Sequence, residues 1–161
     1  MNAERQRPID LWFARYSDDH RNAVNQRIHM IAVPLILWSV IALLWCLPVI
    51  EGLSRPGLWA ALAMFLAWMF YYRASRAIGF GMLAILVAMA WLTRWLHDLH
   101  GTPGLLRIAL GVFVAAWIAQ FIGHGKLFEG RKPSFFTDLE YLLIGPAWLL
   151  AKLYRRLGLR W

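Results

Sequence analysis

Long apolar runs fill the middle of this chain, and short polar stretches separate them. Four runs approach the roughly 20 residues that a helix needs to cross the hydrocarbon core of a bilayer. They cover residues 30–50, 57–72, 77–93 and 105–122. Each run is predicted to be a helix, because a helix satisfies its own backbone polar groups where water is absent. The pattern predicts an all-α, multi-pass membrane protein with about four transmembrane helices in a single domain, residues 1–161.

Two weaker apolar segments lie outside these runs. Residues 9–16 (IDLWFARY) mix aromatic and aliphatic side chains with Asp10 and Arg15, which indicates a short amphipathic helix on the membrane surface. Residues 141–151 (YLLIGPAWLLA) are too short for a span and contain Gly145 and Pro146. We therefore expect an N-terminal interfacial helix and a C-terminal re-entrant or interfacial helix, with a fifth span as the less favoured alternative.

The tryptophans and glycines add detail to this picture. Several tryptophans near the ends of the runs fit the aromatic belts of membrane proteins, with core filling as the alternative for each: Trp12, Trp38, Trp59, Trp91, Trp95 and Trp148. The connection between the second and third runs is very short, which predicts an antiparallel helical hairpin. Gly79 and Gly81 would let its helices approach closely.

The composition and the placement of charge support a membrane location. The chain is 60% hydrophobic and only 16% charged, which is more apolar surface than a soluble domain of this length can bury. Its formal charge of +8 would suit a nucleic-acid binder, but the basic residues lie between apolar runs. We expect membrane lipid as a partner and no nucleic acid.

The lysines and arginines gather before the first run, between the second and third, and after the fourth. Cytoplasmic loops carry this excess, so both termini are expected on the cytoplasmic side. A bacterial inner membrane and the endoplasmic reticulum both fit this orientation. The residues indicate no oligomeric state.

The same topology divides the five histidines into two groups. His20 and His29 precede the first run and His124 follows the fourth, whereas His97 and His100 fall in the connection on the opposite side. Ionisable groups gathered at a membrane boundary are a functional-site hypothesis by default. Interfacial histidines are also common as hydrogen-bonded residues without a ligand, and the sequence leaves both interpretations open.

Helical spacing constrains any shared site. His20 and His29 are nine residues apart and would lie on opposite faces of one helix, whereas Asn25 and His29 share a face. A common site therefore requires a break, for which the cap-rich stretch DDHRN is suited. Histidines together with a carboxylate such as Glu129 are ligand chemistry typical of non-haem Fe(II), although Glu129 could simply pair with a neighbouring lysine or arginine.

At these residues the sequence resembles a known family. The pattern consists of His20, Asn25 and His29 followed by VPLIL, then QFIGH (residues 120–124), Phe128, Glu129, residues 131–133 (RKP) and Pro146. It is similar to the membrane-bound 2-hydroxy fatty acid dioxygenases of fatty acid α-oxidation. The family uses Fe²⁺ and O₂ to convert a 2-hydroxy fatty acid into the acid one carbon shorter, and in fungi it lies in the endoplasmic reticulum.

The resemblance implies that His20, His29 and His124 are catalytic residues and iron ligands, with Glu129 as a fourth ligand or a close neighbour. We take Asn25, Arg131 and Lys132 as candidate substrate contacts. The chain departs from the family where relatives often carry paired histidines, because Arg21 follows His20 here. Any role of a second histidine at that position is lost.

Two other classes of function stay open at this point. One is a non-catalytic membrane scaffold or lipid-binding protein, which would tolerate replacement of all three histidines. The other is a haem-binding electron carrier, which would need histidines inside facing helices. No histidine lies in the middle of a predicted span.

Overall fold

The computed structural model describes residues 7–49, 55–125 and 139–161. Within these ranges the chain forms five α-helices and no strand: α1 (Pro8–Asp18), α2 (Ala23–Trp45), α3 (Leu58–Ala74), α4 (Arg76–Gly123) and α5 (Leu139–Arg156). The prediction of an all-α protein is confirmed. α5 extends beyond the apolar patch at 141–151 on which its prediction rested. Its last turn is basic and was therefore not part of that patch.

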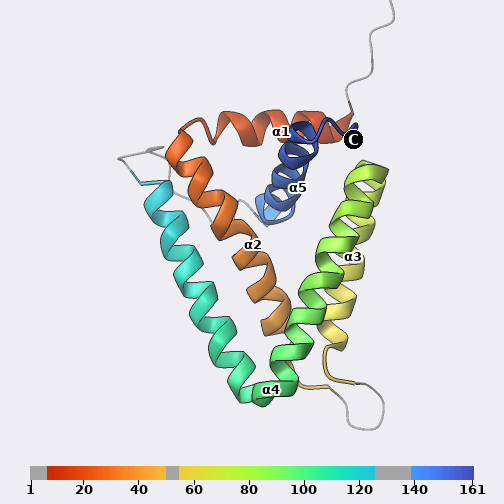
Figure 1. The fold of residues 1–161 in the computed structure, drawn as a ribbon, viewed down its shortest axis with the longest axis vertical. Helices are drawn as coiled ribbons and strands as arrows, with labels where there is room; N and C mark the ends of the chain where they lie inside the picture. The colour runs from red at the N-terminus through yellow and green to blue at the C-terminus, as the bar shows by residue number, and fades with distance from the viewer. Residues whose placement is uncertain (1–6, 50–54, 126–138) are drawn as a thin grey trace, which may run out of the picture.

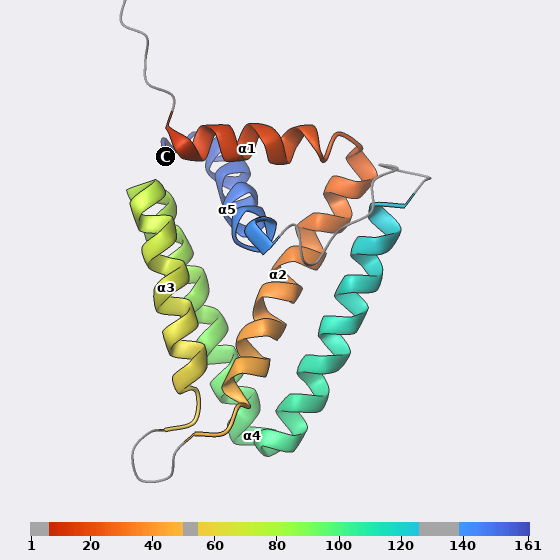
Figure 2. The ribbon, with the colours of Figure 1, turned by 180° about the vertical axis from the view of Figure 1, so that it is seen from behind.

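The helices form a V of long rods that is closed at one end (Figure 1). α2, α3 and the two arms of α4 run along the long axis, and α1 lies across their upper ends with α5 beneath it (Figures 1 and 2). We call this the α1 end of the molecule. α4 turns back on itself at the other end, which we call the Gly101 end. Both ends of the described chain lie at the α1 end.

The turn in α4 rests on a single glycine. Gly101 has φ 64° and ψ 178°, a conformation that is essentially restricted to glycine. His97 and His100 lie in the helical arm that leads into this bend, and Pro103 follows it. The sequence predicted a connecting loop that carries both histidines, and that prediction is wrong. Helical hydrogen bonding continues up to the bend, so one residue reverses the chain where a loop was expected.

The α3–α4 hairpin has the tight geometry that its glycines predict. Ser75 alone separates the two helices. A Cβ on Gly79 would lie 2.6 Å from the Tyr72 Cα atom of α3. A Cβ on Gly81 would overlap the Tyr154 hydroxyl of α5, so the second glycine brings α5 and not α3 close to α4.

Tryptophans occupy two different environments. Trp59, Trp91 and Trp95 are exposed, as expected for side chains that meet a membrane interface. Trp38 and Trp148 are only 6% and 1% exposed, and both belong to buried clusters. The belt prediction is therefore wrong for these two, because their indole rings fill the spaces between helices.

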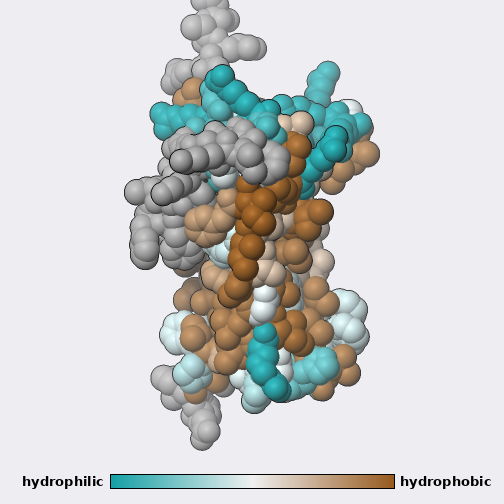
Figure 3. Space-filling view, turned by 90° about the vertical axis from the view of Figure 1, so that its left-hand side faces the viewer, coloured by the Kyte–Doolittle hydropathy of each residue, from teal (hydrophilic) through white to brown (hydrophobic). Residues whose placement is uncertain are grey.

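An apolar band crosses the middle of the molecule on the face drawn in Figure 3. Figure 3 shows brown hydrophobic surface between hydrophilic surface at the α1 end and at the Gly101 end. Large hydrophobic side chains are exposed along the long helices, among them Ile31, Phe80 and Val87. By length and composition, α2 and α4 could each cross a membrane, whereas α3 is a shorter apolar helix of 17 residues.

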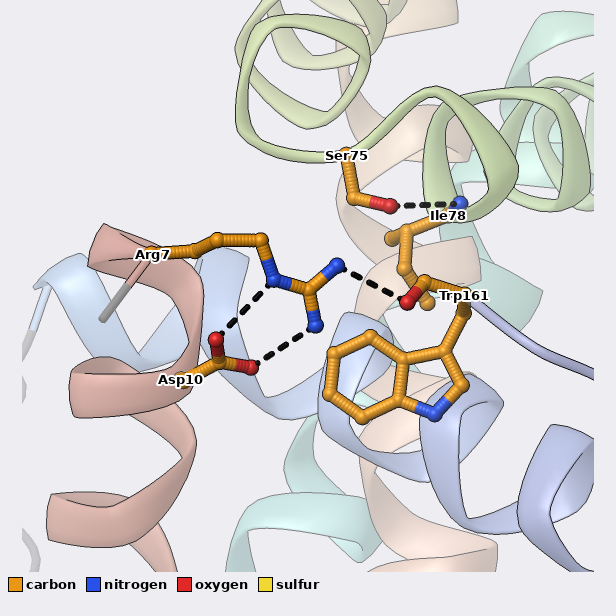
Figure 4. A network of polar contacts seen from close by, with 5 residues as sticks. All are labelled: Arg7, Asp10, Ser75, Ile78 and Trp161. Atoms are coloured by element: carbon orange, nitrogen blue, oxygen red, sulfur yellow. Dashed lines mark hydrogen bonds and ion pairs between the residues drawn. The ribbon is translucent and has the colours of Figure 1, made fainter. Parts of the chain in front are cut away.

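Polar contacts join the two ends of the described chain. The Arg7 guanidinium donates to both carboxylate oxygens of Asp10 at 2.9 and 3.0 Å and to the Trp161 carbonyl oxygen at 2.8 Å (Figure 4). The hydrogen bond to Asp10 raises the pKa of Arg7. In the same view, the Ser75 hydroxyl caps α4 by accepting from the Ile78 backbone N–H. The contacts of Arg7 hold the start of α1 against the end of the chain.

Candidate metal centre

A break between α1 and α2 places the first histidine. α1 ends at Asp18 and α2 begins at Ala23, which confirms the break predicted within the DDHRN stretch. Asn22 caps α2, because its side-chain oxygen accepts from the backbone N–H groups of Val24 at 2.8 Å and Asn25 at 3.3 Å. His20 lies in the connecting segment and can therefore turn toward the same side as His29, which lies in the second turn of α2.

Three histidines converge at this point, close to the α1 end. The His29 Nε2 atom lies 3.1 Å from the His20 Nε2 atom and 3.1 Å from the His124 Nε2 atom. One nitrogen from each of the three rings fits within a 4.8 Å limit, and all three residues are buried. His124 caps the end of α4. Three separate segments of the chain thus bring the imidazoles together, as the sequence predicted.

Hydrogen bonds of the His20 and His29 rings fix which ring nitrogen carries the proton. The His20 Nδ1–H group donates to the Tyr16 carbonyl oxygen at 2.7 Å, and the His29 Nδ1–H group donates to the Asn25 carbonyl oxygen at 3.0 Å. A carbonyl oxygen can only accept, so the hydrogens are on Nδ1. In the neutral rings Nε2 is then the nitrogen that carries the lone pair. This arrangement is typical of metal-binding histidines, whose other nitrogen donates to a carbonyl or carboxylate.

The spacing of the Nε2 atoms fits a cation between them. Two lone pairs that face each other at 3.1 Å repel, unless a cation or a proton lies between them. Nitrogen ligands about 2.0–2.1 Å from a metal in tetrahedral geometry are about 3.3 Å apart, close to the spacing found here. The same spacing leaves no room for a porphyrin between two axial histidines. The donor set therefore suits a single metal ion.

Aromatic rings enclose one side of the cluster. The Tyr16 ring stacks on the His20 ring at a centroid distance of 4.1 Å and an interplanar angle of 12°. Trp148 of α5 packs against Tyr16 at 4.9 Å and donates from Nε1 to the Ser17 hydroxyl at 2.8 Å. Burial, and to a lesser extent Tyr141, raises the pKa of Tyr16. The phenol therefore stays neutral and closes this side as an apolar wall.

Asn25 has an unusual environment beside the cluster. Its side chain is 0% exposed, and neither of its amide atoms has a hydrogen-bond partner among the residues that the structure describes. A Cβ on Gly123, the residue before His124, would overlap the Asn25 amide oxygen. Gln120 is also buried, and its side chain adjoins the His29 ring. A buried amide without partners has hydrogen-bonding capacity left for a ligand.

The other candidate residues divide into two groups. Glu129, Arg131 and Lys132 lie outside the described residues. His97 and His100 lie at the Gly101 end of α4, far from the cluster along the long axis. His97 contacts the Thr102 hydroxyl at 3.1 Å, which gives it a local partner at the bend.

Sequence reasoning missed several residues that shape the site. Tyr16 could have been found, because it lies four residues before His20 and carries the acceptor for its ring. The sequence indicated Gly123 only as one of the glycines that end a helix. Trp148 lies near the His20 ring, Gln26 contacts the His20 backbone, and Lys152 contacts Gln26. The local sequence predicts none of these contacts.

Comparisons with known proteins agree with the residue pattern. The family model described as 2-hydroxy-palmitic acid dioxygenase Mpo1-like matches residues 7–157. The 2-hydroxy-palmitic acid dioxygenase MPO1 of Saccharomyces cerevisiae is 28% identical over 144 residues, which cover 89% of this chain and 78% of the yeast protein. No solved structure matches the chain significantly. The matched region contains all three histidines of the cluster.

Proposed function

The chain belongs to the Mpo1-like family, and from this membership and the histidine cluster we propose that it is an Fe²⁺-dependent dioxygenase of 2-hydroxy fatty acids. The product would be the fatty acid one carbon shorter. Atom balance requires one O₂ for each substrate molecule, with the carboxyl carbon leaving as CO₂ and the remaining hydrogens as water. The yeast 2-hydroxy-palmitic acid dioxygenase suggests the substrate class, and the cluster offers a place for the metal.

The convergence of His20, His29 and His124 is the observation that carries this proposal. Three neutral nitrogen donors leave coordination positions open for a substrate and O₂, as non-haem iron oxygenases require. Glu129 stays a candidate for a fourth ligand or close neighbour. A scaffold protein would have no use for three buried imidazoles whose ring nitrogens converge at one point.

Bound Fe²⁺ would supply the redox chemistry, and the chain's own residues would prepare its surroundings. The backbone carbonyls of Tyr16 and Asn25 hold the His20 and His29 rings in the metal-binding tautomer. Tyr16 and Trp148 exclude water from one side of the cluster. The His20 and His29 rings are thus fixed before a substrate arrives, which lowers the cost of ordering them during the reaction.

We propose that Asn25 contacts the substrate. Its amide is buried beside His29 and has no partner among the described residues, so it can donate to or accept from a polar group such as the 2-hydroxyl or the carboxylate. Gly123 makes room for this side chain. Arg131 and Lys132 are proposed as cationic contacts for the substrate carboxylate, because basic side chains recognise carboxylates.

We further propose that α2, α3 and the two arms of α4 provide four membrane spans, with both termini on the cytoplasmic side. The apolar band of Figure 3 and the exposed hydrophobic residues support this arrangement. α1 and α5 would lie at the cytoplasmic interface, in a bacterial inner membrane or the endoplasmic reticulum. The acyl tail would extend among the helices, where each buried CH₂ contributes about 0.8 kcal/mol.

The test uses the full chain purified in detergent and loaded with Fe²⁺ without air. Admission of O₂ with 2-hydroxypalmitic acid should yield the C15 acid, one O₂ consumed per product, and palmitic acid without the 2-hydroxyl should stay unchanged. Chelation should abolish the reaction, and His124→Ala should lack it. Turnover that survives chelation, or survives in the folded His124→Ala variant, would refute the metal mechanism.

A further inference from the structure

We propose that Gln26 is a positioning residue for His20, held in place by Lys152 of α5. The inference rests on the proposed function, since it concerns the geometry of the metal centre. It assigns a role to two polar side chains that the resemblance does not include. Neither residue touches the imidazole nitrogens that face the cluster.

A continuous chain of hydrogen bonds joins α5 to the segment that carries His20. The Lys152 Nζ atom donates to the Gln26 Oε1 atom at 2.8 Å. The Gln26 Nε2 atom donates to the His20 backbone carbonyl oxygen at 2.6 Å. Lys152 and Gln26 are 126 residues apart in the sequence, so the contact forms only when α5 packs against α2.

The chemistry of the two partners sets the orientation of the Gln26 amide. An ammonium group can only donate, and a backbone carbonyl can only accept. The amide oxygen must therefore face Lys152 while the amide nitrogen faces His20. A flipped amide would lose both hydrogen bonds, so Lys152 selects the orientation in which Gln26 can hold the His20 backbone.

The surroundings of Lys152 explain why its ammonium binds an amide. It lies 3.8 Å above the centre of the Trp148 ring, and it has no carboxylate partner among the residues that the structure describes. Partial burial, with added repulsion from Arg155 and Arg156, lowers the pKa of Lys152. The Trp148 face and the Gln26 oxygen are the two contacts that favour its charged form.

His20 benefits from an external support because it lies outside both helices. Its carbonyl oxygen is not held by a helical hydrogen bond, whereas the backbone of His29 lies within α2. Tyr16 fixes the His20 ring through its carbonyl oxygen and by stacking. Gln26 fixes the His20 backbone from the other side. Together they hold the Nε2 atom at its position facing His29.

The expected effect is on the metal and is larger than the effect on the fold. Loss of groups that orient a metal ligand typically lowers metal affinity by about 10- to 100-fold. Gln26→Glu separates the two effects: a carboxylate pairs well with Lys152 but cannot donate to the His20 carbonyl oxygen. Compared without metal, the variant should keep the thermal midpoint of wild type, and it should lose about 10-fold or more in metal affinity.

The experiment compares the full-length variants in detergent by competition of Zn²⁺ with a chromophoric chelator. Wild type and Arg156→Met should bind equally, because Arg156 is an exposed cation one turn beyond Lys152. Gln26→Glu should bind more weakly, and Lys152→Met should fall between the two. Co²⁺ spectra add a second readout, since a displaced His20 changes the ligand field of the bound ion.

The outcomes separate this inference from the proposed function. If Gln26→Glu binds Zn²⁺ as tightly as wild type and gives the same Co²⁺ spectrum, the positioning role is overturned. The metal centre itself would still stand if His124→Ala lost binding in the same assay. If wild type bound no metal, both proposals would fail. Lower affinity of Gln26→Glu, with the thermal midpoint of the metal-free protein unchanged, would support the inference.

Discussion

The His124 Nε2 atom lies 3.1 Å from the His29 Nε2 atom, although 95 positions separate the two residues. Close packing where α2 and α4 meet explains this approach. Ala32 and Ile36 of α2 form a buried cluster with Ala116 of α4, and two of these three side chains are single methyl groups. The close packing of the two helices therefore determines how closely the imidazoles meet.

Replacement of any cluster histidine should remove the metal. In His20→Ala, His29→Ala and His124→Ala, one of three nitrogen donors is lost, and we expect metal content well below one ion per chain by elemental analysis of the purified protein. His97→Ala is the matched control, because His97 lies at the Gly101 end. Equal metal content in all four variants would place the metal elsewhere or show it to be adventitious.

Removal of the metal should lower the thermal stability of the wild-type protein. A ligand that binds only the folded state stabilises it by about 2.7 kcal/mol at 100 times its dissociation constant. Chelation should therefore lower the midpoint of unfolding in detergent by several degrees, and added Fe²⁺ or Zn²⁺ should restore it. His29→Ala should show no response to chelation. If chelation left the unfolding midpoint of the wild-type protein unchanged, the result would contradict a tightly bound metal ion.

Two glycines in the second arm of α4 make a matched pair. Gly123→Ala would place a methyl group against the Asn25 amide oxygen, and we expect most activity to be lost because Asn25 must move. Gly111→Ala has nothing within 4 Å of its new methyl group. It should keep full activity and gain about 0.5–1 kcal/mol from helix propensity. Product formation and thermal midpoints measure both effects, and equal activity of the two variants would argue against the role of Asn25.

The bend at Gly101 should tolerate no side chain without cost. Because its φ and ψ lie in a region essentially limited to glycine, Gly101→Ala should lower the free energy of unfolding by about 1–3 kcal/mol. Denaturant unfolding in mixed micelles gives this value. The metal content of the folded fraction should stay at the wild-type level, since the bend is at the opposite end from the cluster. Unchanged stability would mean that the bend adopts another conformation.

Opposite ends of the molecule should be accessible from opposite sides of the membrane. Arg15→Cys and Asp98→Cys, each in a Cys46→Ala background, place exposed thiols at the α1 end and the Gly101 end respectively. In intact bacterial cells an impermeant thiol reagent should label position 98 alone. Position 15 should react only after permeabilisation. Labelling of both positions in intact cells would contradict the proposed spans.

The sequence predicted the helical class and the meeting of three histidines, because both follow from strong local patterns. Apolar runs determine the helices, and the number of helical passes along the long axis determines which polar segments share an end. The break before α2 was predictable from Asn22 and its neighbours, whose side chains cap helices. The iron-binding role of the histidines stays a prediction.

Tertiary packing decided the features that the sequence did not predict. A glycine alone does not reveal whether it marks a loop or a one-residue reversal, so the continuation of helix through His97 and His100 was missed. Trp148 has the sequence context of an interfacial residue, yet Tyr16 and Lys152 cover its ring. The contact of Lys152 with Gln26 depends on the placement of α5, which no local periodicity encodes.

The contribution of α5 to the cluster has a consequence for biosynthesis. Trp148 and Lys152 support Tyr16 and Gln26, so the surroundings of His20 are complete only after the ribosome has made α5. A nascent chain that ends before α5 would hold all three imidazoles but not the lateral support of His20. Metal loading of the proposed site would then follow translation, and a cell would be protected from uncontrolled oxygen chemistry on unfinished chains.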